Sequence, residues 1–487
     1  MILACSVLLP ILASVLIALL RKVKRTPLLI LSVILQALST ALSIAVIVLP
    51  EASLHVFSVT PQISLAFASD ATAKFFLALI AGGWLLVMLY SCVYMKHEKK
   101  EPRFYICMFL SEAAMIGAAL SSGLVSMYLF YELLTISSMP LVLHTETKES
   151  IRAAMKYLFY SIAGAFMALF GIFVLSTVAP TLDFTAGGVG IESSPLVLWG
   201  IFLAVLGFGA KAGLYPLHGW LPTAHPVAPA PASALLSGLI AKAGVLTIIR
   251  TVFFVAGPET LKGTWVQTTL LVLALLTVLI GSTMAYSEKV LKKRLAFSTV
   301  SQISYALVGL FLFTEAGVEG AILQVTFHAA VKMCLFLFAG AVIYLTGKTT
   351  VDEVYGIGRR MPVITVCYTV AALSLIGIPP MAGVFSKWTL ATAALDSVAA
   401  PLSFIIPIVL LVSALLTAGY LLQISVRAFF PGDARLPEFA APQSKKEPVL
   451  MVLPLLILAA FALLAGVFSG GSITLADTIA QAILPTV

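Results

Sequence analysis

Long apolar stretches dominate this chain. Fourteen largely apolar segments follow one another along its 487 residues, each close to the ~20 residues with which an α-helix crosses a hydrocarbon layer about 30 Å thick. They lie near residues 2–20, 27–49, 71–95, 103–121, 123–144, 154–179, 195–216, 230–255, 266–286, 294–314, 320–346, 363–391, 402–430 and 448–469. The sequence therefore predicts an all-α polytopic membrane protein, one membrane domain with 14 transmembrane helices.

Composition supports the same class. Hydrophobic residues make up 61% of the chain and charged residues only 10%, which excludes an ordinary soluble enzyme. The five cysteines are scattered without a CxxC pair, so we expect no disulfide framework, no metal site and no cofactor within this chain. Basic residues follow the first apolar run and do not precede it, so we expect a transmembrane helix there and not a cleaved signal peptide.

Basic residues alternate between the predicted loops. Loops on one side of the bilayer carry 22 of the 29 lysines and arginines, whereas the opposite loops carry only Lys262. The 22 residues are Arg21, Lys22, Lys24, Arg25, Lys96, Lys99, Lys100, Arg103, Lys148, Arg152, Lys156, Lys289, Lys292, Lys293, Arg294, Lys348, Arg359, Arg360, Arg427, Arg435, Lys445 and Lys446. Short cytoplasmic loops retain lysine and arginine, so this asymmetry predicts both termini outside a prokaryotic-type cytoplasmic (inner) membrane. It also explains the net charge of +8 without a nucleic-acid partner.

Charged residues also occur within the predicted helices. Such a residue near the bilayer centre costs at least ~2.5 kcal/mol, and it usually faces a bundle interior or an aqueous path. The basic residues in or beside a helix are Lys74, Lys211, Lys242, Arg250, Lys332 and Lys387, and two acidic residues lie in mid-helix, Glu112 and Glu132. His328 and Lys332 are four residues apart, so they share one helix face with Gln324 one turn earlier.

Some of these residues have a simpler structural interpretation. Lys74 begins its helix and can extend towards the interface. Arg250 lies near the outer end of the eighth helix, where an anchoring role is favoured. Glu112 either tunes a lysine or holds a helix contact. The remaining charges are too many and too mixed in sign for a purely structural role, so we expect a functional chain of Glu132, Lys211, Lys242, Lys332 and Lys387, joined by His328.

Two predicted helices contain clustered prolines and glycines. The segment GAKAGLYPLHGWLPTAHPVAPAPAS carries Pro216 and Pro222 after Lys211, and LIGIPPMAGVFSKW carries Pro379 and Pro380 before a second lysine. Proline interrupts helical hydrogen bonding, so the freed carbonyls need water or polar partners. The breaks fall in the seventh and twelfth helices, which predicts two inverted five-helix repeats. The predicted units are residues 1–95 (first three helices), 103–255 (helices 4 to 8), 266–430 (helices 9 to 13) and 448–487 (last helix and tail).

Five separated motifs resemble one family of membrane proteins. They are KAGLYPLHGWLPTAHPVAPAPASALLSGLIAKAG, YELL around Glu132, KKRLAFSTVSQISY, FHAAVKMCLFLFAG and GIPPMAGVFSKW. Over roughly residues 103–430 they look like the antiporter-like subunits of the complex I superfamily, which includes subunits of respiratory complex I, Mrp-type sodium/proton antiporters and membrane-bound energy-converting hydrogenases. The segment AHPVAPAPASALLSG is most similar to the hydrogenase branch and to the D-type subunits of Mrp antiporters.

The resemblance implies a role for each charged position. The implied proton path runs from an ion pair of Glu132 with Lys211 to Lys242, then to His328 with Lys332, and finally to Lys387. His225 either serves proton uptake or fixes its loop, and Glu112 is a secondary candidate. Some relatives carry a second histidine where Gln324 stands here, so the central relay would depend more on water.

The implied function is proton translocation by an antiporter-like membrane subunit of a multisubunit ion-pumping complex. The drive would come from redox partner subunits such as a membrane-bound hydrogenase, because this chain shows no redox centre and any clusters or nickel–iron site belong to those partners. Alternatives are an Mrp-type Na+/H+ antiporter subunit and a membrane subunit of a complex I NADH/ferredoxin:quinone oxidoreductase. A self-contained sodium/proton exchanger is less favoured, because the sequence shows no clustered pair of aspartates that could bind sodium. A non-transporting scaffold would not explain the intramembrane charges.

Overall fold

The protein is a bundle of membrane-spanning helices. This computed structural model describes residues 1–60, 63–430 and 447–485. Each of the fourteen predicted crossings corresponds to one helix or to an interrupted run of helices. Within the described residues, 12 helices are long and apolar enough to cross a membrane. The other two crossings are the serine- and threonine-containing α12 (Leu291–Phe311) and the interrupted pair α15 (Pro362–Ile376) and α16 (Gly383–Ser397). The predicted all-α polytopic class is confirmed.

The remaining helices follow in chain order. The first group comprises α1 (Ile2–Leu19), α2 (Arg25–Val48), α3 (Ala71–Tyr94), η1 (Met95–His97), α4 (Glu101–Leu120), α5 (Leu124–Val142), α6 (Lys148–Val178), α7 (Pro195–Ala212) and α8 (Leu221–Val227). The eighth crossing comprises α9 (Ala230–Leu235), the π-helical η2 (Leu236–Ile240), α10 (Lys242–Ile249) and the π-helical η3 (Arg250–Ala256). The rest are η4 (Pro258–Thr260), α11 (Trp265–Ser287), α13 (Glu315–Thr346), η5 (Val351–Glu353), α14 (Ile357–Arg360), α17 (Leu402–Phe429), α19 (Val449–Val467) and α20 (Ser469–Ile483).

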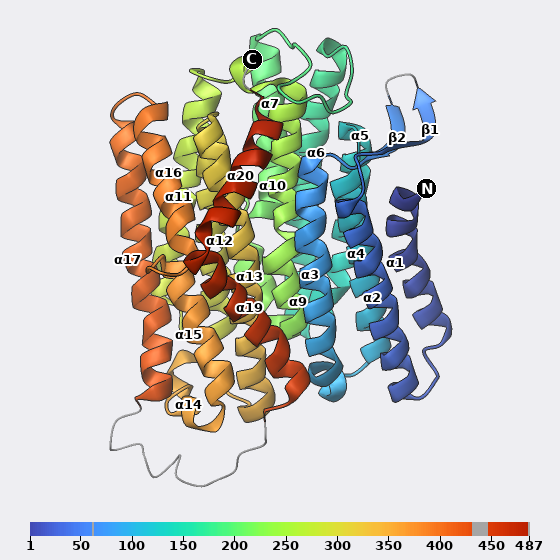
Figure 1. The fold of residues 1–487 in the computed structure, drawn as a ribbon, viewed down its shortest axis with the longest axis vertical. Coiled ribbons are helices and arrows are strands. Elements are labelled where there is room, and N and C mark those ends of the chain that lie inside the picture. The colour runs from blue at the N-terminus through green and yellow to red at the C-terminus, as the bar shows by residue number, and fades with distance from the viewer. Residues whose placement is uncertain (61–62, 431–446, 486–487) are drawn as a thin grey trace.

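Both ends of the chain lie at one end of the bundle, and α14 lies at the opposite end with the basic loops (Figure 1). The first end also carries an antiparallel hairpin of β1 (Ser53–Thr60) and β2 (Ile63–Ala68). Backbone and side-chain donors before and within α5 hold it, because Ser122 N donates to Ala66 O at 3.0 Å and Ser126 Oγ donates to Ser64 O at 2.6 Å. The sequence did not predict this hairpin, since it lies between two apolar runs.

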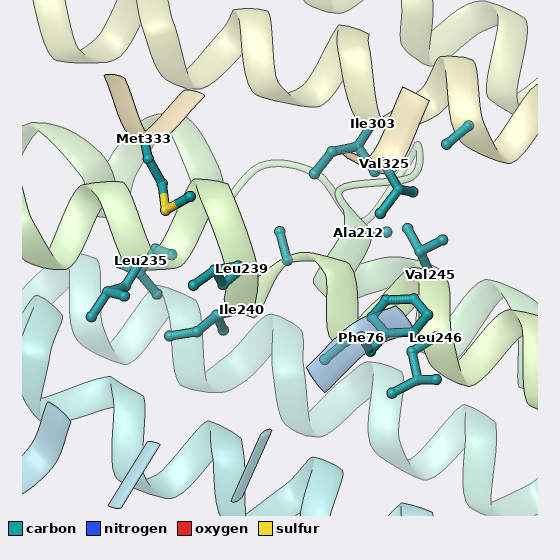
Figure 2. Close-up of a cluster of buried hydrophobic side chains, with 14 of the residues drawn as sticks. Phe76, Ala212, Leu235, Leu239, Ile240, Val245, Leu246, Ile303, Val325 and Met333 are labelled. Carbon is teal, nitrogen blue, oxygen red and sulfur yellow. The ribbon is translucent and has the colours of Figure 1, made fainter. Parts of the chain in front are cut away.

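The eighth crossing forms the centre of the bundle. Its segment Ala230–Ala256 is 100% buried, whereas the corresponding share is 33–39% for the peripheral α1 and α2. Side chains from α3, α12 and α13 pack around it, among them Phe76, Ile303 and Met333 (Figure 2). Gly238 is required at this contact, because a Cβ there would lie 2.4 Å from Met333 Cγ. Two π-helical segments therefore lie where lipid cannot reach, and such segments often mark functional sites.

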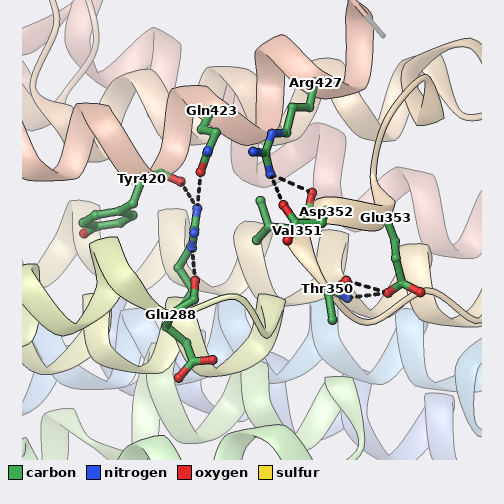
Figure 3. Close-up of polar contacts among 9 residues, drawn as sticks. Glu288, Thr350, Val351, Asp352, Glu353, Tyr420, Gln423 and Arg427 are labelled. Carbon is green, nitrogen blue, oxygen red and sulfur yellow. Dashed lines mark hydrogen bonds and ion pairs between the residues drawn. The ribbon is translucent and has the colours of Figure 1, made fainter. Parts of the chain in front are cut away.

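The basic end of the bundle is held by arginine contacts (Figure 3). Arg294, in the first turn of α12, donates to Glu288 O at 2.7 Å and to Gln423 Oε1 of α17 at 2.9 Å. Arg427, near the end of α17, pairs with Asp352 of η5 at 2.7 Å. These contacts join the loop before α12, the segment after α13 and the end of α17, so several of the basic loop residues also fix helix ends.

The C-terminal segment extends further than predicted. The sequence predicted a tail after the fourteenth crossing, but α20 follows α19 and packs against α13 and α3. Its sequence SGGSITLADTIAQAI is too short and polar for the apolar-run criterion, yet it buries Ala476, Ile479, Ala480 and Ile483 along one side. The predicted loop residues Arg435, Lys445 and Lys446 lie outside the described residues.

Arg250 holds the outer end of the eighth crossing. It begins η3, is only 1% exposed, and pairs with both oxygens of Asp70, with Nη1–Oδ2 and Nη2–Oδ1 distances of 2.6 and 2.7 Å. Phe184 and Phe254 lie on the guanidinium, with ring centroids 4.8 and 4.5 Å from Cζ. Asp70 also caps α3 by accepting from Ala73 N at 2.8 Å. This geometry agrees with the anchoring role predicted for Arg250.

We expect Asp70→Asn to destabilise the protein by about 3 kcal/mol, because it leaves the buried guanidinium without its counter-ion while keeping a capping side chain. Thermal unfolding of the detergent-solubilised protein measures this effect. Lys262→Ala is the control, since its exposed pair with Glu259 should contribute less than about 0.5 kcal/mol. Equal unfolding midpoints for the two variants would contradict the anchoring role.

Candidate functional site

The centre of the bundle holds a lysine–histidine contact. Lys242 stands at the junction of η2 and α10, and its Nζ lies 2.8 Å from His328 Nδ1 of α13. The same Nζ donates to Ser237 O at 2.6 Å. One turn after the histidine, Lys332 donates to Leu295 O of α12 at 3.1 Å. The structure thus brings together three residues that the sequence analysis selected, all of them buried.

These lysines have no carboxylate at contact distance. The ion pairs formed among the described residues include none of Lys211, Lys242, Lys332 and Lys387. Removing an ammonium group from water without a counter-ion costs several kcal/mol, and burial disfavours the charged form of a lysine. A lysine in this setting can therefore give up its proton, which a salt-bridged structural lysine does much less readily.

Lys211 lies near Glu132 but contacts a neutral neighbour. Its Nζ donates to Thr135 Oγ1 at 2.7 Å, one turn after Glu132 on α5, and lies 4.3 Å from the ring centroid of Tyr131. Glu132 is half-buried, and its Oε1 has no hydrogen-bond partner in the structure. The implied ion pair of Glu132 with Lys211 is therefore not formed in this conformation, because the lysine donates to the threonine hydroxyl. The two charges still act on each other electrostatically.

Both predicted helix breaks are present, but their carbonyls have different partners. Lys387 of α16 donates to Leu375 O and Ile376 O at the end of α15, at 2.5 and 2.7 Å. A cation there also lies at the negative end of the α15 dipole. In the break after α7, Trp220 Nε1 instead donates to Ala210 O at 2.8 Å.

The prolines expected to cause the breaks lie in or beside them. Pro216 lies between α7 and α8, Pro222 lies in the first turn of α8, and Pro379 and Pro380 lie between α15 and α16. Tyr215–Pro216 and Pro379–Pro380 are cis peptide bonds. Each break thus has a lysine nearby, but only the one in the twelfth crossing binds the freed carbonyls.

Amide and hydroxyl groups lie between the central site and Lys387. Gln324, one turn before His328, donates to Gln302 O of α12 at 3.0 Å. Its own Oε1 accepts from Ser386 Oγ at 2.8 Å, and Ser386 directly precedes Lys387 in α16. Gln324 thus lies between the central histidine and the last lysine, at the position where the sequence analysis expected greater dependence on water.

Several neutral partners were not singled out from the sequence. They are Thr135, Ser237, Thr299, Gln302 and Ser386, and each contacts a member of the lysine chain or a neighbour of one. Ser237 Oγ and Thr299 Oγ1, for example, are 2.7 Å apart beside the central lysine. The unusually polar run STVSQ in α12 was the one signal that could have indicated two of these positions.

His225 lies beside the central site without contacting it directly. It belongs to α8, is fully buried, and stacks on Phe336 of α13 with ring centroids 4.6 Å apart. Neither of its ring nitrogens has a hydrogen-bond partner in the structure. The charges of Lys292, Lys332 and Lys242 all act on this ring. Its position is therefore between the basic end of the bundle and the central lysines.

Glu112 belongs to a different contact. It projects from α4 towards α2, where its Oε1 accepts from Gln36 Nε2 at 2.7 Å and from Ser39 Oγ at 2.9 Å. Glu112 is fully buried, and its Oε2 and the Gln36 Oε1 have no hydrogen-bond partner. Of the two roles considered for Glu112, this geometry favours the helix contact. Among the described residues, no group of three or more His, Cys, Asp and Glu side chains could hold a metal ion.

Comparison with known families agrees with this arrangement. The family described as "NADH:quinone oxidoreductase/Mrp antiporter, TM" matches residues 121–417, which include both breaks and all four lysines. The chain belongs to this family. A second family, "NADH-Ubiquinone oxidoreductase (complex I), chain 5 N-terminus", matches residues 56–105. The resemblance inferred from the five motifs is thereby confirmed.

Relatives from three branches of the NADH:quinone oxidoreductase/Mrp antiporter family have similar identities. The N-type subunit of the NADH-quinone oxidoreductase of Desulforudis audaxviator is 31% identical over 84% of this chain and 83% of that protein. The D-type subunit of the Na(+)/H(+) antiporter of Alkalihalophilus pseudofirmus is 32% identical over 80% and 77%. Hydrogenase-4 component B of Escherichia coli is 30% identical over 82% and 62%. The hydrogenase and Mrp relatives predicted from the sequence are thus present, alongside a complex I subunit.

Chains in several solved membrane complexes have the same fold. A chain of the Mrp complex from Dietzia sp. superimposes with a TM-score of 0.85 at 23% identity, covering 99% of this chain and 97% of that chain. A chain of the archaeal membrane-bound sulfane sulfur reductase gives a TM-score of 0.88 at 22% identity, with the same coverage. A chain of respiratory complex I from Thermus thermophilus gives 0.83 at 23% identity. All three are membrane complexes.

The Glu112 contact generates a stability prediction. We expect Gln36→Leu to lower the free energy of unfolding by about 1–3 kcal/mol, because the buried carboxyl group loses a donor and cannot recover it from water. The double variant Gln36→Leu with Glu112→Leu should recover part of this loss, since apolar replacement of both partners can be nearly neutral. Thermal unfolding of the three proteins measures both effects. A Gln36→Leu variant as stable as wild type would show that the contact is unimportant.

Proposed function

We propose that this chain is the proton-translocating, antiporter-like membrane subunit of a multisubunit ion-pumping complex. The observation that carries the proposal is the enclosed contact of Lys242 Nζ with His328 Nδ1, 2.8 Å apart and without a carboxylate in contact. Such a pair can share or pass one proton, because either nitrogen can donate when the other accepts. A structural pair would need a permanent charge partner at this depth.

The proposed path continues from this pair in both directions. Towards α5 it reaches Lys211, which switches between the Thr135 hydroxyl seen here and the Glu132 carboxylate proposed as its alternative partner. Towards α16 it passes Gln324 and ends at Lys387. Coulomb coupling of two unit charges ~8 Å apart is about 2 kcal/mol at an effective dielectric of ~20. A charge displacement at Glu132 would therefore change proton occupancy at the next site.

A cavity at the basic end supports proton uptake from that side. It has a volume of about 170 Å3, and its lining includes Glu98, Lys292 and residues 226–229, which run from the end of α8 to the residue before α9. Burial raises the pKa of Glu98, against the opposing charge of Lys292, so this carboxyl group binds protons more readily than an exposed one. Lys292 donates to Ala228 O at 2.5 Å, and Leu295, the acceptor for Lys332, lies one turn deeper on α12.

The partners and the arrangement of the chain belong to the same proposal. The energy for proton translocation comes from other membrane subunits and peripheral redox subunits, as in the hydrogenase and complex I branches, or the chain works in an Mrp-type assembly that also moves Na+. Both termini lie outside the cytoplasmic membrane. The two breaks, each with a lysine nearby, support two inverted repeats over residues 103–255 and 266–430, preceded by residues 1–95 and followed by residues 448–487.

We expect Lys211→Ala and Glu132→Ala to abolish ion translocation while assembly is preserved, because each removes one partner of the proposed switch. The measurement is proton translocation by the whole complex in proteoliposomes. Lys74→Ala is the matched control, since this lysine lies at a helix end and donates to Leu49 O. Normal proton translocation by Lys211→Ala or by Glu132→Ala would refute the proposed change of partner at Lys211.

Lys387 allows a second test, which compares two replacements. Lys387→Met should stop translocation, because methionine can neither carry a proton nor donate to the α15 carbonyls. Lys387→Glu should retain part of the rate, since a protonated carboxyl group can do both. Translocation by Lys387→Met at the wild-type rate would show that proton binding at this position is not required.

A further inference from the structure

A strongly basic cavity lies at the same end of the bundle as the basic loops, apart from the lysine chain. It has a volume of about 590 Å3 and is lined by Arg21, Lys22, Lys100, Pro102, Arg103 and Ile106. Two of these residues lie in the loop between α1 and α2, and the other four lie at the start of α4. Four of the six are cations and none is acidic, so the cavity attracts anions.

Only part of this charge is neutralised within the chain. Glu146, in the loop after α5, pairs with Lys100 at 2.6 Å and also with Arg103. These two cations hold the pKa of Glu146 at about 2, so that the carboxylate is fully charged at neutral pH. In the described structure, the exposed side chains of Arg21 and Lys22 have no hydrogen bond or ion pair. Four cations facing one carboxylate leave an excess of positive charge, concentrated on Arg21 and Lys22.

An apolar stripe ends beside this cavity. α1 lies at the edge of the bundle (Figure 1), and its outward side chains include Leu8, Leu12, Leu16 and Leu19, which are 37–75% exposed. Their spacing of three or four residues places them along one helix face. The stripe ends two residues before Arg21, at the depth where lipid head groups meet the hydrocarbon layer. The cavity thus combines cations at the interface with an apolar surface that runs into the membrane.

We infer that this cavity binds the head group of an anionic phospholipid, with its phosphate between Arg21 and Lys22 and its acyl chains along α1. A soluble phosphate would use the cations but not the leucine stripe, whereas a phospholipid uses both. Clusters of lysine and arginine next to a transmembrane helix attract anionic lipids. The inference does not depend on proton translocation, because it concerns the rim of the bundle and not the buried lysines.

The test is native mass spectrometry of the intact complex after exchange into phosphatidylglycerol or phosphatidylcholine nanodiscs. Wild type should retain phosphatidylglycerol and not phosphatidylcholine. Arg21→Gln with Lys22→Gln should weaken that retention roughly 10- to 30-fold, given the usual contribution of each basic residue near a charged membrane surface. Lys96→Gln with Lys99→Gln is the matched control, since it removes two exposed charges on the same side that do not line the cavity.

Three results would overturn the inference. Equal loss of phosphatidylglycerol in both double variants would reduce it to general surface charge. If millimolar inorganic phosphate released the lipid and other anionic lipids did not, the cavity would be a site for soluble anions. Cross-linking of Lys22 to an acidic segment of another subunit would show that a protein covers the cavity. Thermal unfolding of each variant establishes that a lost lipid does not reflect a lost fold.

Discussion

Ammonium groups buried without a carboxylate in contact are the constraint on which the rest of this structure depends. Each must be kept from lipid and supplied with neutral oxygen or nitrogen acceptors, because an isolated charge in hydrocarbon is expensive. The enclosure of the eighth crossing by α3, α7, α12 and α13 meets the first requirement. Carbonyls, a hydroxyl and one imidazole meet the second, as Lys211, Lys242 and Lys332 show.

Irregular backbone is concentrated where these lysines lie. Lys242 follows a π-helical segment, and Lys387 contacts the end of a helix that stops at Gly377. A carbonyl inside a regular helix already accepts one backbone bond, so helix ends and distorted turns offer the freer acceptors. Lys242 and Lys387 use acceptors of this kind, whereas Lys332 is a further donor to a carbonyl within α12. The interruptions are therefore part of how the bundle accommodates its charges. Glycines such as Gly238 then allow the close packing that excludes lipid around them.

Much of the fold could be predicted from the sequence, because most crossings are apolar over the length that spans the hydrocarbon layer. The breaks at Pro216 and Pro379 were also predictable, since proline cannot donate within a helix. The hydrogen-bond partners of the lysines were harder to predict. Nothing in the sequence indicated that Lys211 would contact Thr135 and not Glu132, because that contact depends on how α5 packs against α7. Neutral side chains such as Ser386 were also missed. A serine in a membrane helix has no large desolvation cost, so its presence does not by itself indicate a functional site.

The two interrupted crossings differ in what holds them. At the end of α7, Ala210 O accepts from Gly213 N and from the Trp220 indole, neither of which gains or loses charge. The carbonyls at the end of α15 are bound by Lys387, whose attraction to a helix C-terminus depends on its proton. If Lys387 releases its proton, as the proposed function requires, its attraction to the end of α15 weakens, whereas the Trp220 contact is unchanged. The stability of the interruption in the twelfth crossing would then depend on proton occupancy, and that of the interruption after α7 would not.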